Sequence, residues 1–427
     1  MLFRSQTLVN HVGKKPRVMV WPYGQFNDVA VQLARQAGMS HYFSLGEKII
    51  NKVGDKHIGR LLLNAETDLN TVKNYLDGID ESKQIQRVLH VDLDYVYDAD
   101  KAQQAKNLDK LIDRIYRYGV TTVYLQAFSD PDGDGVADAL YFPNKYLPVR
   151  DDIFGRIAWQ LQTRAGVQVY AWMPVLAFDL RKSVKEAEYV IDRRTDKPST
   201  KAYLRLSPYN KQNVEIIKSI YNDLSFYAKF NGILFHDDAF LTDFEGAEGD
   251  HAEGMVSPQA KQKTQDLIQL THQLTDALKP YFLRGSYSLK TARNLYASVI
   301  TNPNAEEWLA QNLKTLTDNY DTTAIMAMPY MENEQPISQK EAYQWFASLI
   351  ENVKAQAPLE KVLFEFQAVN WRTQKPIPES ELIDWMTLLQ KNHIYSYGYY
   401  PDNFLTNQPN MNKMKPYFSV NTNAGKK

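Results

Sequence analysis

From residue 85 onward, short apolar runs rich in β-forming residues alternate with amphipathic segments. Eight runs have this character: Val88–Val96, Thr122–Phe128, Val167–Val175, Gly232–Ala239, Leu283–Ser288, Thr323–Tyr330, Val362–Asn370 and Ile394–Tyr400. Seven segments between them have helical character: Ala102–Tyr118, Ile153–Arg164, Lys211–Phe230, Pro258–Leu278, Ala305–Asn319, Gln339–Val353 and Glu379–Lys391. The runs are nearly continuous in apolar residues, as expected of strands that are covered on both faces.

Eight strands that alternate with seven helices predict an α/β fold, a (β/α) barrel of the TIM type. The helical assignment is supported by Leu108, Leu111, Ile112 and Ile115, whose spacing places them on one helix face. A doubly wound sheet is the alternative. It is disfavoured because no glycine-rich phosphate-binding turn follows any run.

Residues 1–80 differ in character from the barrel. Val18–Trp21 predicts a strand, and Asn27–Gly38 and Thr67–Ile79 predict helices. We expect three regions: an N-terminal domain over 1–80, the barrel over 85–410 and a polar tail over 411–427. A buried-strand pattern is reached by residue 18 with no apolar signal region before it, so we expect an N-terminally truncated piece of a longer protein.

Composition excludes several classes of function. Lys and Arg total 49 and Asp and Glu total 50, so net charge provides no attraction to nucleic acid. The absence of cysteine excludes disulfides, cysteine-ligated zinc and a thiol nucleophile. Histidines are too scattered for a metal site. No stretch approaches ~18 apolar residues, which predicts that no helix spans a membrane.

Polar and acidic residues gather where the predicted strands end, which is where barrels of this type carry out catalysis. The residues that we expect at this mouth are Asp92, Asp94, Gln126, Trp172, His236, Asp237, Asp238, Asp243, Arg284, Tyr287, Glu365, Trp371, Tyr399 and Asp402. Carboxylates are costly to bury without a partner or a task. Paired carboxylates beside aromatic rings suit glycoside hydrolysis, and an acidic surplus suits a cationic sugar such as glucosamine.

For some of these residues a structural role stays open. Asp92 and Asp94 are alternatively salt-bridged structural acids, and His236 is alternatively an orienting or structural histidine. Trp371 and Tyr399 line the groove or pack at its rim. Glu365 is functional if it points inward and paired if it points outward. The segment Asp130–Gly135 matches the first half of a calcium-binding loop, but Tyr141 stands where the loop needs glutamate and a strand precedes it. We therefore interpret it as a polar loop at the rim of a groove.

Four segments together resemble the C-terminal domain of PgaB-type proteins, the periplasmic poly-β-1,6-N-acetyl-D-glucosamine N-deacetylases of biofilm export. They are Val91–Asp98, Tyr124–Gly135, Tyr170–Val175 and Tyr397–Phe404. The resemblance implies a (β/α) barrel that binds partly deacetylated polymer in a groove and, in relatives, cleaves it internally. Arg17–Gly24 also resembles a late motif of the family's polysaccharide deacetylase domain, which makes residues 1–80 a remnant of that domain.

By the same resemblance, the groove acids are Asp237, Asp238 and Asp243, and Tyr203 and Trp371 contact sugar. We expect Asp238 or Asp243 to act as the general acid, while Asp237 orients the substrate or stabilises positive charge. The family's deacetylase metal motifs are absent from the sequence, so no cofactor is expected in this chain, although the parent deacetylase domain would need a divalent metal.

The resemblance further implies a periplasmic protein, associated with the outer membrane in its full-length form. Its expected partners are the polysaccharide substrate and an outer-membrane export porin. Two rival hypotheses remain. In the first, the chain is a non-catalytic carbohydrate-binding module that guides the polymer to the pore. In the second, an intact deacetylase is its main function, which the missing metal motifs disfavour.

Overall fold

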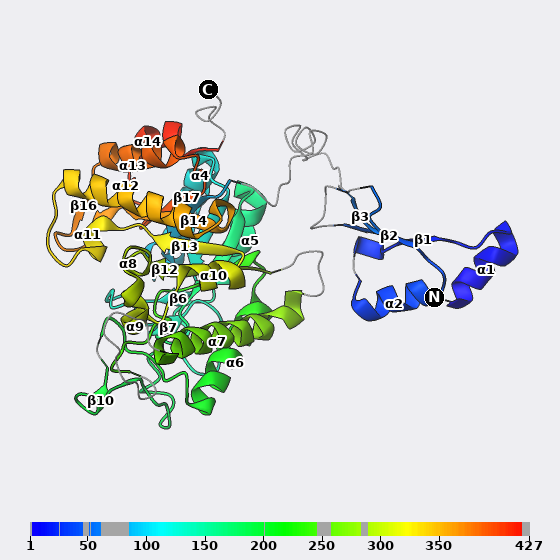
Figure 1. Ribbon diagram of the computed structural model, residues 1–427, viewed down its shortest axis with the longest axis horizontal. Helices are drawn as coiled ribbons and strands as arrows, with labels where there is room; N and C mark the ends of the chain where they lie inside the picture. Colours follow the sequence, from blue (N-terminus) through cyan, green and yellow to red (C-terminus); the bar gives the residue numbers. More distant parts are fainter. Residues whose placement is uncertain are drawn as a thin grey trace. The chain divides into compact units, whose positions relative to one another are not determined.

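In a computed structural model, the chain divides into two compact units, Met1–Gln84 with Pro280–Ser288 and Ile85–Lys279 with Leu289–Lys427 (Figure 1). The structure describes residues 2–24, 26–45, 51, 53–60, 85–199, 201–245, 258–282 and 289–420. Among the helices in these ranges, none combines the length and the apolar character needed to cross a membrane.

The first unit contains a three-stranded parallel sheet in the order β1-β2-β3. Its elements are α1 (Leu2–Val12), β1 (Val18–Val20), η1 (Pro22–Gly24), α2 (Asp28–Gln36), β2 (His41–Leu45) and β3 (His57–Arg60). Asn27 caps α2 by accepting a hydrogen bond from the backbone of Ala30. Trp21, Val31 and Tyr42 are at the centre of a small apolar core. The helix predicted over 67–79 lies outside the described residues.

The second unit is a closed barrel of eight parallel strands, which confirms the predicted fold class. In spatial order the strands are β11 (Gly232–Phe235), β12 (Lys290–Tyr296), β13 (Thr322–Met326), β14 (Val362–Gln367), β17 (Tyr397–Tyr400), β4 (Arg87–Val91), β5 (Thr122–Gln126) and β8 (Gln168–Met173). Their residues are almost all buried, because side chains fill the barrel and helices cover its outer surface (Figure 1).

The longer helices that cover the barrel are α4 (Lys101–Tyr118), α5 (Phe154–Gln160), α6 (Lys211–Tyr227), α7 (Pro258–Phe282), α10 (Leu313–Asn319), α12 (Gln339–Gln356) and α13 (Glu379–Lys391). Helix α4 illustrates how local sequence sets their limits. Asp100 accepts the Ala102 amide at its start, and Gly119 ends it with a left-handed φ of 72°. Between these caps, Leu111 and Ile115 lie on the buried face.

Shorter elements lie in the connections between strands and helices. The short helices and turns are η3 (Leu93–Tyr95), η4 (Leu161–Ala165), α8 (Ser298–Thr301), η5 (Pro303–Ala305), α9 (Glu306–Leu309), α11 (Pro329–Glu332) and η6 (Leu359–Lys361). The two-residue strands pair as hairpins: β6 (Phe128–Ser129) with β7 (Ala139–Leu140), β9 (Ile191–Asp192) with β10 (Lys197–Pro198), and β15 (Val369–Asn370) with β16 (Lys375–Pro376).

The fifth strand is not the predicted Leu283–Ser288. That segment lies outside the described residues, with Arg284 and Tyr287, and the strand at this place in the barrel is β12, Lys290–Tyr296. The physical reason is that Arg293 and Asn294 interrupt its apolar pattern, although both are buried. Arg293 donates to the backbone carbonyl of Ala239, and a buried polar side chain with a partner is tolerated in a core.

Helical order continues past residue 410, where the sequence predicted a polar tail. Helix α14 (Met411–Phe418) begins at Asn410, whose side chain accepts two backbone amides of the first turn. Met414 and Phe418 are fully buried, and the ring of Phe418 packs against Tyr118 and Tyr399. These residues therefore belong to the barrel unit.

Candidate active site

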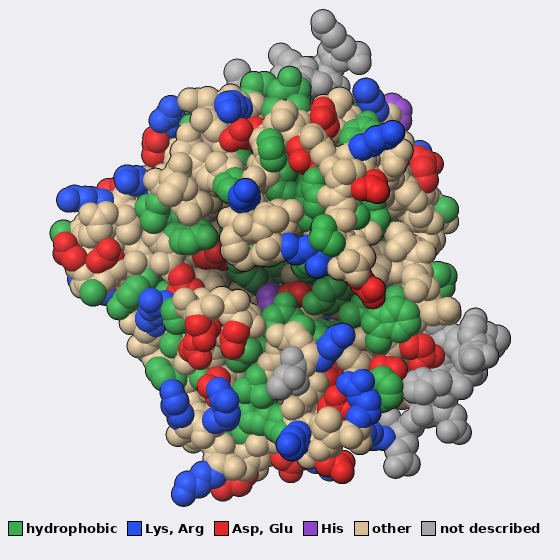
Figure 2. All heavy atoms as spheres, turned by 90° about the vertical axis from the view of Figure 1, so that its left-hand side faces the viewer, with side chains coloured by type: hydrophobic (Ala, Val, Ile, Leu, Met, Phe, Trp, Pro, Cys, Tyr) green, Lys and Arg blue, Asp and Glu red, His purple; other side chains and the backbone are tan. Residues whose placement is uncertain are grey.

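The carboxyl ends of the barrel strands open into a hollow that crosses one face of the molecule. Figure 2 shows this hollow, with a histidine and acidic side chains visible in its depth. The three residues that follow β11 directly, His236, Asp237 and Asp238, are all buried at this end of the barrel. The location agrees with the general placement of active sites in barrels of this type.

Asp237 is the centre of a hydrogen-bond cluster formed by three different segments. Its Oδ2 accepts from the hydroxyl of Tyr203 at 2.8 Å and from the hydroxyl of Tyr296, at the end of β12, at 2.6 Å. Its Oδ1 lies 2.9 Å from Nε2 of His236. Burial by itself would raise the pKa of Asp237, but the charge and hydrogen bond of His236, together with the two hydroxyls, lower it to about 2.

His236 is the charge partner of this carboxylate. Burial lowers the pKa of His236, but Asp237 and then Asp238 outweigh that effect and raise it to about 10. Its ring contacts Trp172 and Tyr203, with centroids 5.2 and 5.4 Å away. An imidazolium beside Asp237 keeps that carboxylate anionic, so the pair is suited to a site where positive charge develops and must be balanced.

Asp238 lies on the other side of His236, with its Oδ1 3.5 Å from Nδ1 of that ring, and its carboxylate also meets the backbone of the loop after β8. Its carboxylate accepts amides from Val175 at 3.0 Å, Leu176 at 2.6 Å and Ala177 at 2.6 Å, and the residue is 0% exposed. A carboxylate committed to three amides holds a loop in place. The contacts therefore give Asp238 a positioning task, rather than an approach to a substrate.

Asp243 lies further along the segment that follows β11 and is partly exposed. It interacts electrostatically with Arg194 and Lys263. Within the described part of the chain, no contact connects its carboxylate to Asp237. Of the three predicted groove acids, the structure thus places one, Asp237, at the centre of the site.

A second wall of the mouth contains Asp92, which directly follows β4. Burial, reinforced by the charges of Asp94 and Asp130, raises the pKa of Asp92 to about 8. Its Oδ2 lies 3.5 Å from the hydroxyl of Tyr400, while its Oδ1 is buried with no hydrogen-bond partner among the described residues. Asp92 is thus a carboxyl group whose neutral form is stable near neutral pH.

Aromatic rings form the floor beside Asp92. Trp172, at the end of β8, lies 5.4 Å from the ring of Tyr400 and 4.5 Å from the ring of His90. Trp371 stacks on Tyr400 with centroids 6.1 Å apart and is partly exposed. Nε1 of Trp172 is another buried donor that has no partner in the described chain. Aromatic faces together with unpaired polar atoms are features of a carbohydrate-binding surface.

Asp94 and Gln126 support the mouth from behind. Asp94 Oδ1 lies 2.5 Å from Nη1 of Arg150 and accepts from the Tyr141 hydroxyl at 2.5 Å and from Ser129 at 3.0 Å. Gln126 accepts the backbone amide of Asp94 at 3.3 Å. These contacts agree with the structural alternative considered for Asp94.

Tyr399 and Asp402 belong to a buried cluster that faces helix α4. Arg114 forms a two-point ion pair with Asp402, at 2.6 and 2.8 Å, and Asp402 is 0% exposed. Tyr399 donates to the same carboxylate at 2.7 Å. Because neighbouring strand residues point to opposite sides, Tyr400 faces the mouth while Tyr399 does not.

Glu332, at the end of α11, is an acid of the mouth that the sequence analysis missed. Its two oxygens accept the backbone amides of Ala297 at 2.8 Å and Ser298 at 3.1 Å. Burial raises the pKa of Glu332 to about 7, and the negative charge of Asp237 adds to the shift. Glu332 accepts the amide of Ala297, and the residue before it, Tyr296, donates its hydroxyl to Asp237, so neighbouring residues of one segment contact both acids.

His90, Glu365 and Asn294 form a polar layer inside the barrel beneath the mouth. His90 Nδ1 lies 2.6 Å from Glu365 Oε1, and Asn294 donates to the other oxygen of Glu365 at 2.8 Å. All three side chains are buried. His90 and Asn294 were missed because each lies within a strand, where the sequence alone does not say which side chains point inward. Glu365 was considered, and the structure turns it inward.

The loop after β6 supports Tyr203. Asp130 accepts the backbone amides of Gly133, Asp134 and Gly135 at 2.9, 3.1 and 2.9 Å. Gly135 has a φ of +80°, and a Cβ at this position would lie 2.1 Å from the ring of Tyr203. Only glycine allows the ring to lie so close to the backbone. The turn therefore forms one side of the slot that holds Tyr203 against Asp237.

The same turn contains the residues of the calcium-like pattern. Carboxylate oxygens of Asp130, Asp132 and Asp134 lie within 4.8 Å of one another, and the last two residues are exposed. Oxygen ligands suit a divalent cation. However, the carboxylate of Asp130 already accepts three backbone amides, which favours a structural turn. That this turn needs no metal ion stays a prediction.

A closed eight-stranded parallel barrel with carboxylates and aromatic rings at its mouth is the arrangement expected of a glycosyl hydrolase-like barrel. The family described as hypothetical glycosyl hydrolase family 13 (GHL13) matches residues 90–400, and the chain belongs to this family.

The chain is 39% identical over 440 residues to poly-beta-1,6-N-acetyl-D-glucosamine N-deacetylase from Escherichia coli (strain K12). The same-named protein of Escherichia coli O157:H7 is 38% identical. These alignments cover 97% of this chain and 64% of each relative, so the chain spans just under two thirds of the length of the curated relatives.

A solved structure is also similar, the PgaB (BpsB) glycoside hydrolase domain from Bordetella bronchiseptica. It has 38% identity and a TM-score of 0.72, and the match covers 79% of this chain and 100% of that chain. The resemblance to PgaB-type proteins is thereby confirmed.

Proposed function

We propose that this chain is an endo-acting glycoside hydrolase that binds and cleaves partially deacetylated poly-β-1,6-N-acetyl-D-glucosamine. The observation that carries the proposal is that the pKa values of two carboxyl groups at the mouth are shifted in opposite directions. The pKa of Asp237 is lowered to about 2, and that of Glu332 is raised to about 7. Glycosidases need such a division of roles between a charged carboxylate and a protonated acid.

In the proposed mechanism, Glu332 protonates the oxygen of the scissile glycosidic bond. As this bond breaks, positive charge develops on the sugar ring, and Asp237 stabilises that charge. A water molecule then attacks the anomeric carbon and gives its proton to the Glu332 carboxylate, which restores the acid for the next cycle. His236 and the hydroxyls of Tyr203 and Tyr296 hold Asp237 in its anionic form and in one orientation. The chemistry needs no cofactor. Asp238, which the sequence favoured as an acid, is fully buried, whereas Glu332 also accepts backbone amides but is partly exposed. Asp243 is less suited because no contact among the described residues connects its carboxylate to Asp237.

Substrate binding is assigned to the aromatic floor, with Trp172 and Trp371, and to the second wall, which contains Asp92. Trp371 offers a partly exposed aromatic face to a sugar ring. Nε1 of Trp172 and Oδ1 of Asp92 are buried and have no hydrogen-bond partner among the described residues. An ammonium group of glucosamine beside Asp92 would favour the charged form of this acid, because an opposite charge lowers a carboxyl pKa. This pairing accounts for a preference for deacetylated units.

The wider role is proposed from the relatives. The relatives are named as N-deacetylases of the same polymer, and residues 1–80 are proposed to be the end of such a deacetylase domain. The full-length protein would process biofilm exopolysaccharide in the periplasm and pass it to an outer-membrane porin. The rival proposal, a binding module without catalysis, uses the same mouth and the same acids.

The test is to incubate the chain with partially deacetylated polymer and to follow the products by mass spectrometry, with Asp237→Asn in parallel. We expect shorter internal fragments from the wild type and a loss of about 100-fold or more in the variant. Cleavage by the variant at the wild-type rate would refute the assignment of Asp237. Binding of polymer by the wild type without any cleavage would establish the binding module instead.

A further inference from the structure

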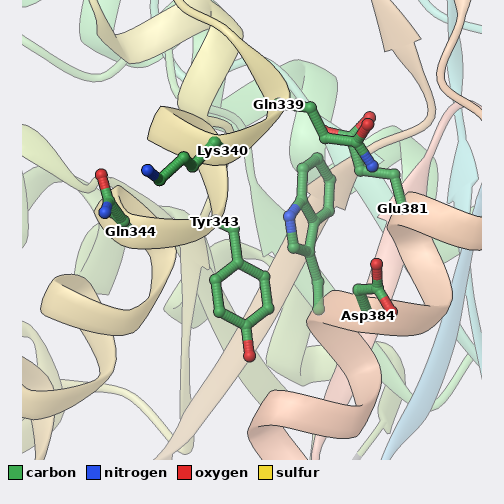
Figure 3. A pocket seen from close by; sticks show the side chains of 7 residues that line it. Gln339, Lys340, Tyr343, Gln344, Glu381 and Asp384 are labelled. Carbon is green, nitrogen blue, oxygen red and sulfur yellow. The ribbon is translucent and has the colours of Figure 1, made fainter.

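A pocket of about 510 Å³ lies between helices α12 and α13, on the outer layer of the barrel unit. Its lining consists of Gln339, Lys340, Tyr343, Gln344, Glu381, Asp384 and Trp385. Figure 3 shows Lys340, Tyr343 and Gln344 on one side of the pocket and Glu381 and Asp384 on the other. The volume is within the usual range for small-molecule sites, about 300–1,000 Å³.

The pocket wall contains a buried carboxylate that has no cation. Glu381 is 4% exposed, and its Oε1 accepts the hydroxyl of Tyr330 at 2.6 Å. Burial raises its pKa, and Asp384, three residues along the same helix, adds to the shift. Within the described part of the chain, no lysine, arginine or histidine forms an ion pair with either acid. Lys340 lines the opposite side of the pocket, so the lining carries two acids and one base. A buried carboxylate is normally paired, so this wall has an unmatched preference for positive charge.

The wall also contains a donor that has no acceptor. Trp385 is 0% exposed, and its Nε1 has no hydrogen-bond partner among the described residues. Its packing partners are aromatic: Phe346 stacks on it at 5.5 Å, Phe366 lies at 6.2 Å and Tyr330 at 6.5 Å. A buried indole N–H usually finds an acceptor. A ligand in the pocket that carries an oxygen atom would supply it.

We infer that this pocket is a second binding site for a glucosamine unit of the polymer, outside the mouth of the barrel. A glucosamine unit offers an ammonium group to Glu381 and Asp384 and hydroxyl oxygens to the indole of Trp385. Tyr343 is 38% exposed and provides an aromatic ring at the pocket. An N-acetylated unit lacks the charge, so the pocket selects deacetylated stretches of the chain. The inference rests on the proposed substrate but not on cleavage.

The pocket is also connected to the proposed active site. Tyr330, which donates to Glu381, lies in α11, the helix that ends with the proposed acid Glu332. Its backbone amide donates to Gln367, the last residue of β14, at 2.9 Å. A polymer bound in the pocket would thus contact Glu381, whose hydrogen-bond partner Tyr330 belongs to the helix that carries Glu332. The expected benefit is tighter binding of long polymer.

The test measures binding rather than turnover. The Asp237→Asn protein is titrated by calorimetry with a β-1,6-linked glucosamine trimer and with its fully N-acetylated counterpart. We expect two binding events for the glucosamine trimer. Adding Asp384→Asn or Trp385→Phe should weaken one of them about ten-fold or more, a loss of about 1.4 kcal/mol, and leave the other unchanged. The N-acetylated trimer should show no binding at the pocket.

Matched controls separate the pocket from general effects. Asp113→Asn removes an exposed acid on α4, and Trp159→Phe alters an indole that is 60% exposed on α5. Both should bind as the parent does. In cleavage-competent protein, Asp384→Asn should raise KM for long polymer several-fold and leave kcat for the trimer unchanged.

A single binding event, or two events that neither pocket variant changes, would overturn the inference. Equal binding of both trimers at the pocket would refute the role of the ammonium group. If the wild type does not cleave, but two binding events remain and the pocket variants remove one, the proposed hydrolase fails while the pocket stands.

Discussion

Replacing Gly135 with alanine tests whether the turn after β6 positions Tyr203 on Asp237. The added Cβ would lie 2.1 Å from Tyr203 Cε1, and ordinary contact begins at 3.4 Å, so the ring must retreat by about 1.3 Å. A retreat of this size takes the hydroxyl out of its 2.8 Å hydrogen bond to Asp237. A hydrogen bond to a charged group contributes about 1.5–3 kcal/mol, so we expect kcat/KM to fall about 10- to 100-fold.

Gly133→Ala is the matched control. Gly133 lies in the same turn with a φ of +74°, and a Cβ there meets nothing within 4 Å. Both variants therefore carry the same left-handed strain, about 1–2 kcal/mol, but only Gly135→Ala displaces Tyr203. Thermal unfolding should show a larger loss of stability in Gly135→Ala, because displacement of Tyr203 adds to the strain that the two variants share.

The assay is the pH dependence of kcat/KM. Because the Tyr203 hydroxyl is one of the groups that lower the pKa of Asp237, its loss should move the acid limb to higher pH in Gly135→Ala alone. The reasoning is refuted if Gly135→Ala and Gly133→Ala have the same kcat/KM, within about two-fold, and the same acid limb.

Three further outcomes follow from the structure. Asp238→Asn should lower the free energy of unfolding by about 3 kcal/mol, because the three loop amides then meet a neutral oxygen in place of a charged one. A urea titration that matches the wild type would contradict this role. Arg114→Met should lower the free energy of unfolding by about 3–5 kcal/mol, because it leaves Asp402 buried without its cation. The variant should keep the kcat of the wild type, and a loss of kcat in the folded variant would place Asp402 in the site. The rate of cleavage should decline as the pH rises through about 7, because Glu332 must be protonated to act as the acid. Glu332→Gln should abolish this alkaline limb of the pH profile. An alkaline limb that persists in the variant would belong to another group.

The sequence predicted the barrel because its strands are buried on both faces and therefore read as nearly continuous apolar runs. It failed at β12, where Arg293 and Asn294 are buried with partners that come from distant segments. Such partners become apparent only once the chain is folded. Tyr296 was missed because it is the last residue of β12, and the predicted strand, Leu283–Ser288, lay earlier in the sequence.

Within the site, the sequence located the acidic cluster but not the direction of each side chain. Asp237 and Asp238 are adjacent, yet one faces the tyrosine hydroxyls and the other accepts loop amides. The same alternation separates Tyr399 from Tyr400. Glu332 was not predicted because it lies at the end of a helix after Pro329, several residues beyond β13, where no strand pattern points to it.

The central claim is that Glu332 donates a proton to the leaving oxygen while Asp237 stays charged. It is tested most directly by comparing wild type and Glu332→Gln on two β-1,6-glucosamine oligomers, one with a natural sugar leaving group and one with an acidic phenol. A phenol of this kind leaves without protonation. We expect the variant to lose about 10²–10⁴-fold on the natural bond and to keep most of its rate on the aryl glycoside. Equal losses on both substrates would contradict the account.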